Sequence, residues 1–445
     1  MRTYHIVTFG CQMNKHDSEH IAGLLESRLG LAPASGIEHA DVIVFNTCAV
    51  REGAEERLIG QVSALKPLKA ENPRLVVAVG GCVAQHERER LFQMLPHVDV
   101  VFGTHNIPEL PDLVLRAASG IPALSVPDEP SLDVERTPSV RESRWHAWLP
   151  IAVGCDNWCS YCIVPRTRGR ERSRPFDEVV AEAERLVADG VVEITLLGQN
   201  VNSYGRDLYG KPRFAEVLRA VARTGVKRLR FVTSHPKDLS DATLHAMAEE
   251  PAVCEYLHLP AQSGSTRILR AMNRGYSKEQ YLAAVERAYE LVPGLALSGD
   301  VIVGFPGETE QDFEGTLDLV RRCQYDQLFT FLYSPRPGTR AAQLPDAVPP
   351  AVAQDRFERL VKLVQDSALE KNRRLAGSVV EVLVEGPSRK DPGMLAGRTR
   401  TNKLVHAPFP AGVDPVSLEG AFVTVRLTEA HAWHLMGEVA GYQRQ

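Results

Sequence analysis

The sequence lacks any apolar run that approaches the roughly 18 residues of a membrane span. The first residues, Met1-Arg2-Thr3-Tyr4-His5-Ile6, also lack the hydrophobic stretch of a signal peptide. We therefore expect a cytoplasmic protein with no membrane partner. In that compartment, the eight cysteines of the chain are expected to be metal ligands or buried thiols rather than disulfides.

An excess of positive charge is also missing, because the 51 Lys and Arg residues are outnumbered by 56 Asp and Glu residues, for a net charge of −5. Any nucleic-acid partner must therefore be held by local basic patches. Two groups qualify: Arg166, Arg168, Arg170, Arg172 and Arg174, and then Arg389, Lys390, Arg398, Arg400 and Lys403. Arginine can bind phosphate through two parallel hydrogen bonds, and a solvated charged face is the alternative for each group.

Three cysteines at close spacing, Cys155, Cys159 and Cys162, are the most informative feature present. Neither a fourth cysteine nor a histidine pair lies nearby to complete a tetrahedral zinc site. Four cysteines normally hold a [4Fe–4S] cluster, so three would leave one iron open. The spacing after a short apolar strand resembles that of the radical S-adenosylmethionine (SAM) superfamily. In that superfamily the open iron binds the amino and carboxylate groups of SAM.

Residues 1–120 alternate strand and helix patterns. Strands are predicted at residues 5–9, 41–45 and 75–79, and helices from Asp17-Ser18, at 51–65 and at 87–95. Continuous apolar strands joined by helices favour a parallel sheet covered on both faces. Cys11, Cys48 and Cys82 each follow one strand, and strand ends gather at one sheet edge, so these thiols could form a second three-cysteine site. Three separate buried cysteines are the alternative.

Residues 121–145 are rich in proline and read as a linker. Residues 146–375 repeat the strand–helix pattern, with strands predicted at 150–153, 191–197, 228–233, 254–259, 295–303 and 327–333. Six such units fit a partial (β/α)6 barrel, in which functional groups gather at the carboxyl ends of the strands. Residues 376–443 alternate as short strands with turn signals, which predicts a small five-stranded barrel like the OB-fold. The fold class is therefore α/β, with this small β-barrel at the C-terminus.

Several longer motifs resemble the radical SAM methylthiotransferases over essentially the whole chain. They are Thr8-Phe9-Gly10-Cys11-Gln12-Met13-Asn14, Asn46-Thr47-Cys48-Ala49-Val50-Arg51-Glu52, Gly80-Gly81-Cys82, Thr195-Leu196-Leu197-Gly198-Gln199-Asn200-Val201-Asn202-Ser203-Tyr204, Tyr333-Ser334-Pro335-Arg336-Pro337-Gly338-Thr339 and Gly397-Arg398-Thr399-Arg400-Thr401-Asn402-Lys403. The last one resembles the RNA-binding TRAM domain of that family. The match is strongest to the members that act on N6-dimethylallyladenosine in tRNA.

The resemblance implies two [4Fe–4S] clusters. Cys155, Cys159 and Cys162 would hold the SAM-binding cluster, and Cys11, Cys48 and Cys82 the auxiliary cluster that carries the transferred sulfur. It further implies SAM contacts from Gln199, Ser234, Gln262, Gly304 and Glu308. No catalytic side chain is assigned. The implied reaction is methylthiolation at C2 of N6-dimethylallyladenosine at tRNA position 37.

The implied partners are the tRNA anticodon stem-loop, an electron donor such as flavodoxin or ferredoxin, and a donor of sulfur or clusters. The protein is expected to be a monomer. A sister enzyme that acts on threonylcarbamoyl-adenosine in tRNA, or on a ribosomal protein, shares the cluster cysteines and stays open as an alternative. An iron–sulfur RNA-binding or redox-sensing protein without turnover is the rival from another class. Cys254 and Cys323 lack partner motifs and are expected to be buried small apolar side chains.

Overall fold

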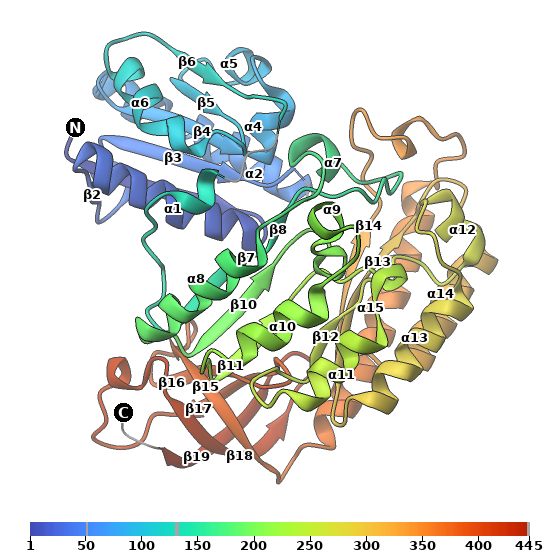
Figure 1. Ribbon diagram of the computed structural model, residues 1–445. Helices are drawn as coiled ribbons and strands as arrows, with labels where there is room; N and C mark the ends of the chain where they lie inside the picture. The colour runs from blue at the N-terminus through green and yellow to red at the C-terminus, as the bar shows by residue number, and fades with distance from the viewer. Residues whose placement is uncertain (50–51, 130–132, 443–445) are drawn as a thin grey trace.

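A computed structural model describes residues 1–49, 52–129 and 133–442. It shows a six-stranded sheet, an open barrel made of two three-stranded sheets, and a closed five-stranded barrel, in that order along the chain (Figure 1). Val50 and Arg51 of the second cysteine motif, Pro130 of the linker and residue 443 lie outside the described residues. Within the described ranges, no helix combines the length and apolarity needed to cross a membrane.

The N-terminal sheet is parallel throughout, in the order β2-β1-β3-β4-β5-β6. Its strands are β1 Thr3–Phe9, β2 Ala32–Pro33, β3 Val42–Thr47, β4 Val76–Gly81, β5 Val100–Phe102 and β6 Ala123–Ser125. Its helices are α1 Gln12–Leu29, α2 Glu52–Ser63, α3 Lys66–Glu71, α4 Cys82–Glu87, α5 Arg90–Met94 and α6 Leu110–Ala118. Every residue of β3 and β4 is buried, as expected when helices cover both faces. The predicted parallel sheet is confirmed, and β6 extends it past residue 120.

Helix α1 begins at Gln12, whereas the sequence predicted a start near Asp17-Ser18. Cys11 occupies the N-cap, where its carbonyl oxygen accepts hydrogen bonds from the backbone N–H groups of Asn14 and Lys15. Asp17 and Ser18 looked like capping residues because of their chemistry. In the structure they face inward, Ser18 toward the hydroxyl of Thr8 at 2.8 Å.

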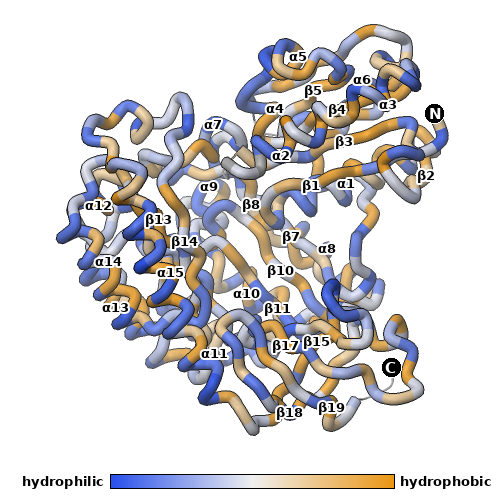
Figure 2. The backbone as a smooth tube through the Cα atoms, turned by 180° about the vertical axis from the view of Figure 1, so that it is seen from behind, coloured by the Kyte–Doolittle hydropathy of each residue, from blue (hydrophilic) through white to orange (hydrophobic). Residues whose placement is uncertain are grey.

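The central barrel has two parallel three-stranded sheets, β7-β10-β11 and β12-β13-β14, joined by a bridge between Leu229 and Val253. The strands are β7 His146–Pro150, β10 Glu193–Leu197, β11 Arg228–Phe231, β12 Tyr256–His258, β13 Ala296–Val303 and β14 Gln327–Leu332. The larger outer helices are α8 Phe176–Ala188, α10 Phe214–Ala222, α11 Asp241–Glu249, α13 Lys278–Leu291, α14 Glu310–Cys323 and α15 Pro350–Arg373. The predicted six-stranded partial barrel is confirmed. Figure 2 shows hydrophobic residues along β3 and β10, and every residue of these two strands is buried.

The first barrel strand was predicted at residues 150–153, but β7 ends at Pro150. Residues Ala152–Val153 form the short strand β8, which pairs antiparallel with β9, Arg172–Ser173. Gly154 follows at φ +75°, and a Cβ there would lie 2.1 Å from the carbonyl oxygen of Arg170. This tight crossing bends the chain out of the barrel and presents the loop that begins at Cys155.

The C-terminal unit is a closed barrel in the order β15-β16-β17-β19-β18, as predicted. Its strands are β15 Val379–Pro387, β16 Met394–Thr399, β17 Leu404–Pro408, β18 Phe422–Ala430 and β19 Leu435–Tyr442. Alternate residues point inward and form a small apolar core of their own around Val382, Leu395 and Val425.

Two arginines of β11 attach this barrel to the central one. Arg228 is fully buried and donates to the carbonyl oxygen of Arg398 at 2.7 Å and to Glu381 at 2.8 Å. Arg230 donates to the carbonyl oxygens of Thr399 and Arg400, both at 2.8 Å. The β16–β17 turn is therefore bound to the amino end of β11.

Part of the second basic group thus serves the interface between the two barrels rather than an RNA-facing surface. The Arg400 guanidinium pairs with Glu255 at 2.7 Å, and the Lys403 ammonium pairs with Asp326 at 2.7 Å. These contacts correct the prediction that the whole group faces RNA. A polar interface between domains uses the same side-chain types as a phosphate-binding surface, so composition alone could not separate the two. Arg389 and Lys390 remain exposed.

The segment of residues 133–142, read as a linker from its prolines, packs along α1. Val140 donates its N–H to the carbonyl oxygen of Glu19 at 2.9 Å, and a Cβ on Gly23 would lie 2.2 Å from the carbonyl oxygen of Pro138. We call these residues the strap. The strap joins the N-terminal sheet to β7 along an ordered path.

The Arg228→Ala variant should loosen the interface between the two barrels. It removes a buried cation and leaves the carbonyl oxygen of Arg398 without its donor, at a cost of about 3 kcal/mol. Thermal unfolding and limited proteolysis after α15 should show a lower midpoint and faster release of the C-terminal barrel. The control Arg389→Ala changes an exposed arginine of the same unit and should leave both unchanged. Equal behaviour of the two variants would contradict this account of the interface.

Candidate active site

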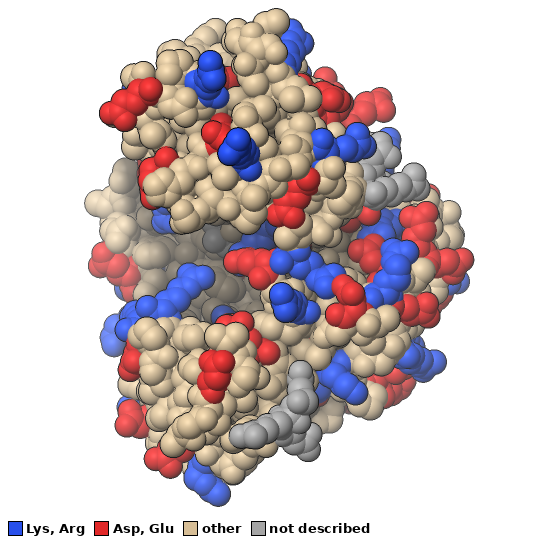
Figure 3. All heavy atoms as spheres, turned by 90° about the vertical axis from the view of Figure 1, so that its left-hand side faces the viewer, with Lys and Arg blue, Asp and Glu red and all other residues tan. Residues whose placement is uncertain are grey.

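One cavity of about 2060 Å³ runs between the three units and into the central barrel. Figure 3 shows its entrance as a hollow between the upper N-terminal part and the lower C-terminal part of that face. Typical small-molecule pockets measure about 300–1000 Å³, so this space exceeds the needs of one ligand. All six cysteines that the sequence singled out line it: Cys11, Cys48, Cys82, Cys155, Cys159 and Cys162.

The cysteines at the three strand ends meet, as the sheet topology predicted. The thiol of Cys48 is hydrogen-bonded to those of Cys11 and Cys82. The hydrogen bonds with Cys48 lower the pKa of Cys82 to about 6 and that of Cys11 to about 7, although burial acts in the opposite direction. The same contacts raise the pKa of Cys48. Three buried thiols that share hydrogen bonds are chemically suited to hold a metal centre, and the lowered pKa values of Cys11 and Cys82 favour their thiolates.

Short-range contacts hold Cys11 in place. Gly10 has φ +150°, and a Cβ there would lie 2.7 Å from the Cβ of Cys48, so no larger residue fits. The Asn14 side chain accepts a hydrogen bond from the backbone N–H of Cys11 at 3.3 Å. Asn46 donates to the carbonyl oxygen of Asn14 at 2.9 Å. The two asparagines come from the first and second cysteine motifs, Asn14 after Cys11 and Asn46 before Cys48, so residues on either side of the cysteines also build the site.

A buried ion pair lies beside these thiols. The Arg168 guanidinium donates to Asp17 at 2.6 Å and 3.4 Å, and both side chains are almost fully buried. The same guanidinium is hydrogen-bonded to Cys82 and helps to lower its pKa. Since Arg168 belongs to the central unit and Asp17 to α1, this pair fixes the N-terminal cysteines against the loop of the other three.

The second group, Cys155, Cys159 and Cys162, lies on the loop after β8. Burial raises the pKa of Cys155 and Cys162 to about 12. Two donors point at the sulfurs: the backbone N–H of Asn157 at 3.4 Å from Cys155 Sγ, and Arg274 Nη1 at 3.3 Å from Cys159 Sγ. Donors of this kind stabilise ligating thiolates, so the loop fits an iron–sulfur cluster.

Four polar side chains on the cavity wall have buried atoms with no hydrogen-bond partner. These atoms are Gln199 Oε1, Ser234 Oγ, His235 Nε2 and Tyr333 OH. Buried polar atoms in native proteins are nearly always paired, so a polar ligand is the natural partner here. Gln199 and Ser234 were predicted from the sequence. His235 and Tyr333 were given no site role from the sequence, although Tyr333 begins one of the family motifs.

Three non-glycine residues on the wall have left-handed backbone conformations: Thr233, Gln262 and Asn402. Thr233 has φ +65° and Gln262 has φ +69°. The conformation of Thr233 is a genuine outlier, because its side chain is β-branched. Strain of this kind concentrates at functional sites, where the surrounding structure enforces it. Gln262 is kept in place by backbone hydrogen bonds to Asp300 and Ile302, at 2.8 Å and 2.9 Å.

Gly304 and Glu308 are not among the residues that line the cavity. The Glu308 carboxylate accepts from the Gly304 N–H at 2.9 Å and pairs with Arg356 at 3.2 Å. Their predicted role at SAM therefore stays a prediction, without support from a contact with the cavity.

The arginine run after the second cysteine group is only partly exposed. Arg168 and Arg174 are buried, and Arg174 pairs with Glu182 at 2.6 Å. This corrects the prediction of one continuous phosphate-binding patch, because Arg168 pairs with Asp17 of α1 and Arg174 pairs with Glu182 of α8 inside the protein. Arg166, Arg170 and Arg172 are exposed, and Arg170 pairs with Asp156.

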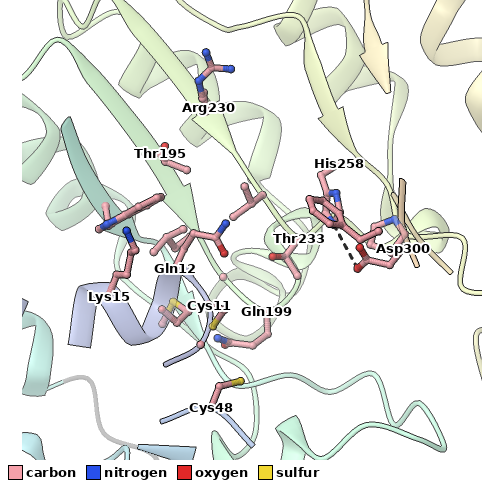
Figure 4. A pocket seen from close by; sticks show the side chains of 18 of the residues that line it. Cys11, Gln12, Lys15, Cys48, Thr195, Gln199, Arg230, Thr233, His258 and Asp300 are labelled. Carbon is pink, nitrogen blue, oxygen red and sulfur yellow. Dashed lines mark ion pairs between the residues drawn. The ribbon is translucent and has the colours of Figure 1, made fainter. Parts of the chain in front are cut away.

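The far end of the cavity is polar as well. Figure 4 shows Cys11, Cys48 and Gln199 at one end, and Thr195 and Arg230 at the other. His258 and Asp300 form an ion pair at 3.5 Å on the barrel wall between them. Cys254 and Cys323 are fully buried away from this space, as expected of small apolar side chains.

Comparison with family models divides the chain in the same way as the fold does. Residues 3–103 match a group described as uncharacterized protein family UPF0004. Residues 149–320 match the radical SAM superfamily, and residues 373–440 match the TRAM domain.

Curated relatives match nearly the full chain. A tRNA-2-methylthio-N(6)-dimethylallyladenosine synthase from Carboxydothermus hydrogenoformans is 50% identical over 440 residues, or 98% of this chain and 99% of the relative. One of the same name from Caldicellulosiruptor saccharolyticus is 49% identical over 442 residues, 98% of this chain and 92% of the relative. The chain belongs to this synthase family. The family resemblance seen in the cysteine motifs is thereby confirmed.

Among solved structures, the radical S-adenosylmethionine methyltransferase TsrM from Kitasatospora setae shares the fold. One structure of it, with cobalamin and a [4Fe–4S] cluster bound, aligns at a TM-score of 0.54 with 15% identity, covering 89% of this chain and 77% of the other. At that identity the likeness shows the architecture alone, which the synthase family therefore shares with a wider group of radical SAM proteins.

Asp17→Asn should destabilise the protein strongly. It leaves the Arg168 cation buried without its counter-charge, and breaking a buried pair costs about 3–5 kcal/mol. The thermal midpoint should fall, and iodoacetamide should modify Cys82 faster. Asp112→Asn, an exposed change on α6, is the control and should do neither. The double variant Asp17→Asn/Arg168→Met should recover part of the loss. A double variant no more stable than Asp17→Asn would show that the pair is not the cause.

Proposed function

We propose that the protein is a tRNA-modifying methylthiotransferase that acts at C2 of N6-dimethylallyladenosine at position 37. The observation that carries this proposal is that two separate three-cysteine groups face one cavity. An inert aromatic C–H bond calls for radical chemistry, and a new carbon–sulfur bond calls for a sulfur source beside it. The family's shared name supports the same reaction.

We assign Cys155, Cys159 and Cys162 to a [4Fe–4S] cluster that binds SAM, and Cys11, Cys48 and Cys82 to a second [4Fe–4S] cluster. Both thiol sets fit, because each offers three sulfurs with hydrogen-bond donors beside them. When bound, the clusters and SAM supply a 5′-deoxyadenosyl radical, the methyl group and the transferred sulfur. The protein's contribution is to bind and position these groups and the substrate, and to exclude water.

The wall residues define how SAM is held. Gln199, Ser234 and Gln262 lie at barrel strand ends beside the second cysteine group, and His235 and Tyr333 add unpartnered polar atoms. His235 accepts from the N–H of Lys237 through Nδ1, so its Nε2 carries the proton and can donate to a ligand. Gly304 and Glu308, for which no contact with the cavity is seen, complete the proposed set beside the adenine of SAM.

The substrate base must leave the anticodon stack to reach this cavity, at a cost of a few kcal/mol. Exposed Arg166 and Arg172 on the central unit, and Arg389 and Lys390 on the C-terminal barrel, are candidates for the phosphate contacts that offset it. The stem-loop would then bridge these two units over the entrance to the cavity.

The remaining parts of the proposal concern organisation and partners. We assign residues 1–120 to the auxiliary cluster domain, 146–375 to the radical SAM core and 376–443 to the TRAM domain, with 121–145 between the first two. The proposal also includes a flavodoxin or ferredoxin as electron donor and a donor of sulfur or clusters. It further includes a monomeric state and a cytoplasmic location.

Nucleoside mass spectrometry tests the proposed reaction. Anaerobically reconstituted protein, SAM and a reductant are incubated with tRNA that carries dimethylallyladenosine without the methylthio group. A mass gain of one methylthio group on that nucleoside is expected. Release of 5′-deoxyadenosine without a gain would contradict the substrate, and threonylcarbamoyl-adenosine tRNA would then be tested. Absence of 5′-deoxyadenosine would favour a sensor without turnover.

Single cysteine variants should separate the two groups. Cys155→Ala should abolish formation of 5′-deoxyadenosine, because one ligand of the SAM-side cluster is gone. Cys48→Ala should keep SAM cleavage and lose methylthio transfer. Cys323→Ala, a buried cysteine away from the cavity, should retain both activities. Product formation by Cys48→Ala would overturn the assignment of the auxiliary cluster.

The Arg274→Met variant should lower the reduction potential of the SAM-side cluster. It removes a buried positive charge and a hydrogen bond to Cys159 Sγ, both of which favour the reduced, more negative state. Redox titration followed by electron paramagnetic resonance should show the decrease, and SAM cleavage should slow. Arg274→Lys keeps the charge and should lie nearer to the wild type. Equal potentials in all three proteins would rule out this role.

A further inference from the structure

Two histidines and a glutamate meet outside the cavity. His16 and His20 lie one turn apart on α1, and Glu135 lies on the strap, in the short 3-10 helix Asp133–Arg136. All three side chains are buried, and one ligand atom of each lies within 4.8 Å of the other two. None of the three lines the cavity.

The distances between the ligand atoms suit one metal ion. His16 Nε2 lies 3.1 Å from His20 Nε2 and 3.4 Å from Glu135 Oε2. With zinc bonds of about 2.0–2.1 Å, neighbouring ligands in a tetrahedron lie roughly 3.3 Å apart. The observed separations therefore match two edges of such a tetrahedron.

A neighbouring hydroxyl fixes the tautomer of His20. The Thr137 hydroxyl donates to the carbonyl oxygen of Val134 at 2.7 Å, so its oxygen accepts from His20 Nδ1 at 2.8 Å. The proton of His20 then resides on Nδ1, and the lone pair of Nε2 points toward His16. Histidine ligands of metals are held by such a hydrogen bond from the second ring nitrogen.

The charged groups around His16, His20 and Glu135 are mostly paired with one another. Arg174 lies 3.7 Å from Glu135, but it is paired with Glu182 and donates to the carbonyl oxygen of Pro150. Arg168 is likewise paired with Asp17. Glu135 Oε2 therefore shares the Arg174 guanidinium with Glu182, and it accepts no hydrogen bond from the residues that the structure describes. Burial holds the pKa of His16 well below its usual range, so its imidazole is neutral and can act as a ligand.

We propose that His16, His20 and Glu135 bind one zinc ion that fastens the strap to α1. Two imidazoles and a carboxylate are a recognised zinc donor set. Among divalent ions, nitrogen-rich sites of this kind bind zinc more tightly than iron or manganese. The ion is distinct from the iron–sulfur clusters and takes no part in the radical reaction. Its role is to keep α1, which carries Asp17 beside the Cys82 thiol, in register with the central unit.

The alternative is a hydrogen-bond chain without an ion, in which the Nε2 proton of His16 points to His20 or Glu135. Burial raises the pKa of Glu135 to about 8, so without a cation this carboxyl would hold a proton. A bound zinc ion releases the carboxyl proton of Glu135 and requires the single ring proton of His16 to reside on Nδ1. The two states differ in metal content and in the coordination seen at the zinc edge, which an experiment can separate.

The test uses the holoenzyme with its clusters, incubated with one equivalent of Zn²⁺ and desalted. Zinc and iron per chain are measured by mass spectrometry, and X-ray absorption is recorded at the zinc edge. About one zinc ion per chain is expected, with only nitrogen and oxygen neighbours at about 2.0–2.1 Å and iron unchanged. No retained zinc, or a sulfur shell at about 2.3 Å that places zinc on the cysteines, would overturn the proposal.

Matched variants locate the ion without removing any proposed cluster ligand. His20→Gln should lose zinc at least tenfold at unchanged iron content, whereas His39→Gln, an exposed histidine of the same unit, should retain it. Thr137→Val keeps all three ligands, removes the hydroxyl that bonds His20 and the Val134 carbonyl oxygen, and should weaken zinc binding by about 10–100-fold. Full zinc retention by His20→Gln would place the ion elsewhere. The wild-type absorption spectrum decides the question even if a variant fails to fold.

Discussion

The buried ion pair between Asp17 and Arg168 is the contact on which the site depends. It joins α1, whose N-cap is Cys11, to the chain that leaves the loop of Cys155, Cys159 and Cys162. Burying the pair costs folding free energy, because two charges lose their contact with water. In exchange, the pair fixes the position of α1 relative to the cysteine loop. One guanidinium touches Asp17 and the Cys82 thiol together, so the two cysteine groups cannot shift independently.

The rest of the architecture supports this arrangement. A parallel sheet gathers Cys11, Cys48 and Cys82 at one edge, and a partial barrel gathers polar residues at its strand ends. The barrel is open at one side, which leaves a cavity far larger than one cofactor needs. The C-terminal barrel, bound through Arg228 and Arg230, closes the lower rim of that opening. A long polyanion could therefore lie across the entrance while one base enters.

Sequence reasoning succeeded where local pattern and chemistry coincide. Hydrophobic periodicity predicted the strands before Cys11, Cys48 and Cys82. Ligand chemistry identified the spacing of Cys155, Cys159 and Cys162 as a cluster motif. It failed where long-range contacts decide. Arg400 and Lys403 looked like phosphate ligands, but they form ion pairs with Glu255 and Asp326. The sequence does not show which partner a charged side chain meets in the folded protein. The left-handed backbone of Thr233 and the meeting of His20 with Glu135 depend on tertiary packing, which no local pattern records.

The central claim is that the two cysteine groups hold separate clusters across one cavity. Its most direct test is the iron content and Mössbauer spectrum of two triple variants, one with Cys11, Cys48 and Cys82 changed to Ala and one with Cys155, Cys159 and Cys162 changed to Ala. The wild type should hold about eight irons per chain, and each variant about four, as one intact [4Fe–4S] cluster. A wild type with about four irons, lost entirely in both variants, would mean one shared cluster and would contradict the account.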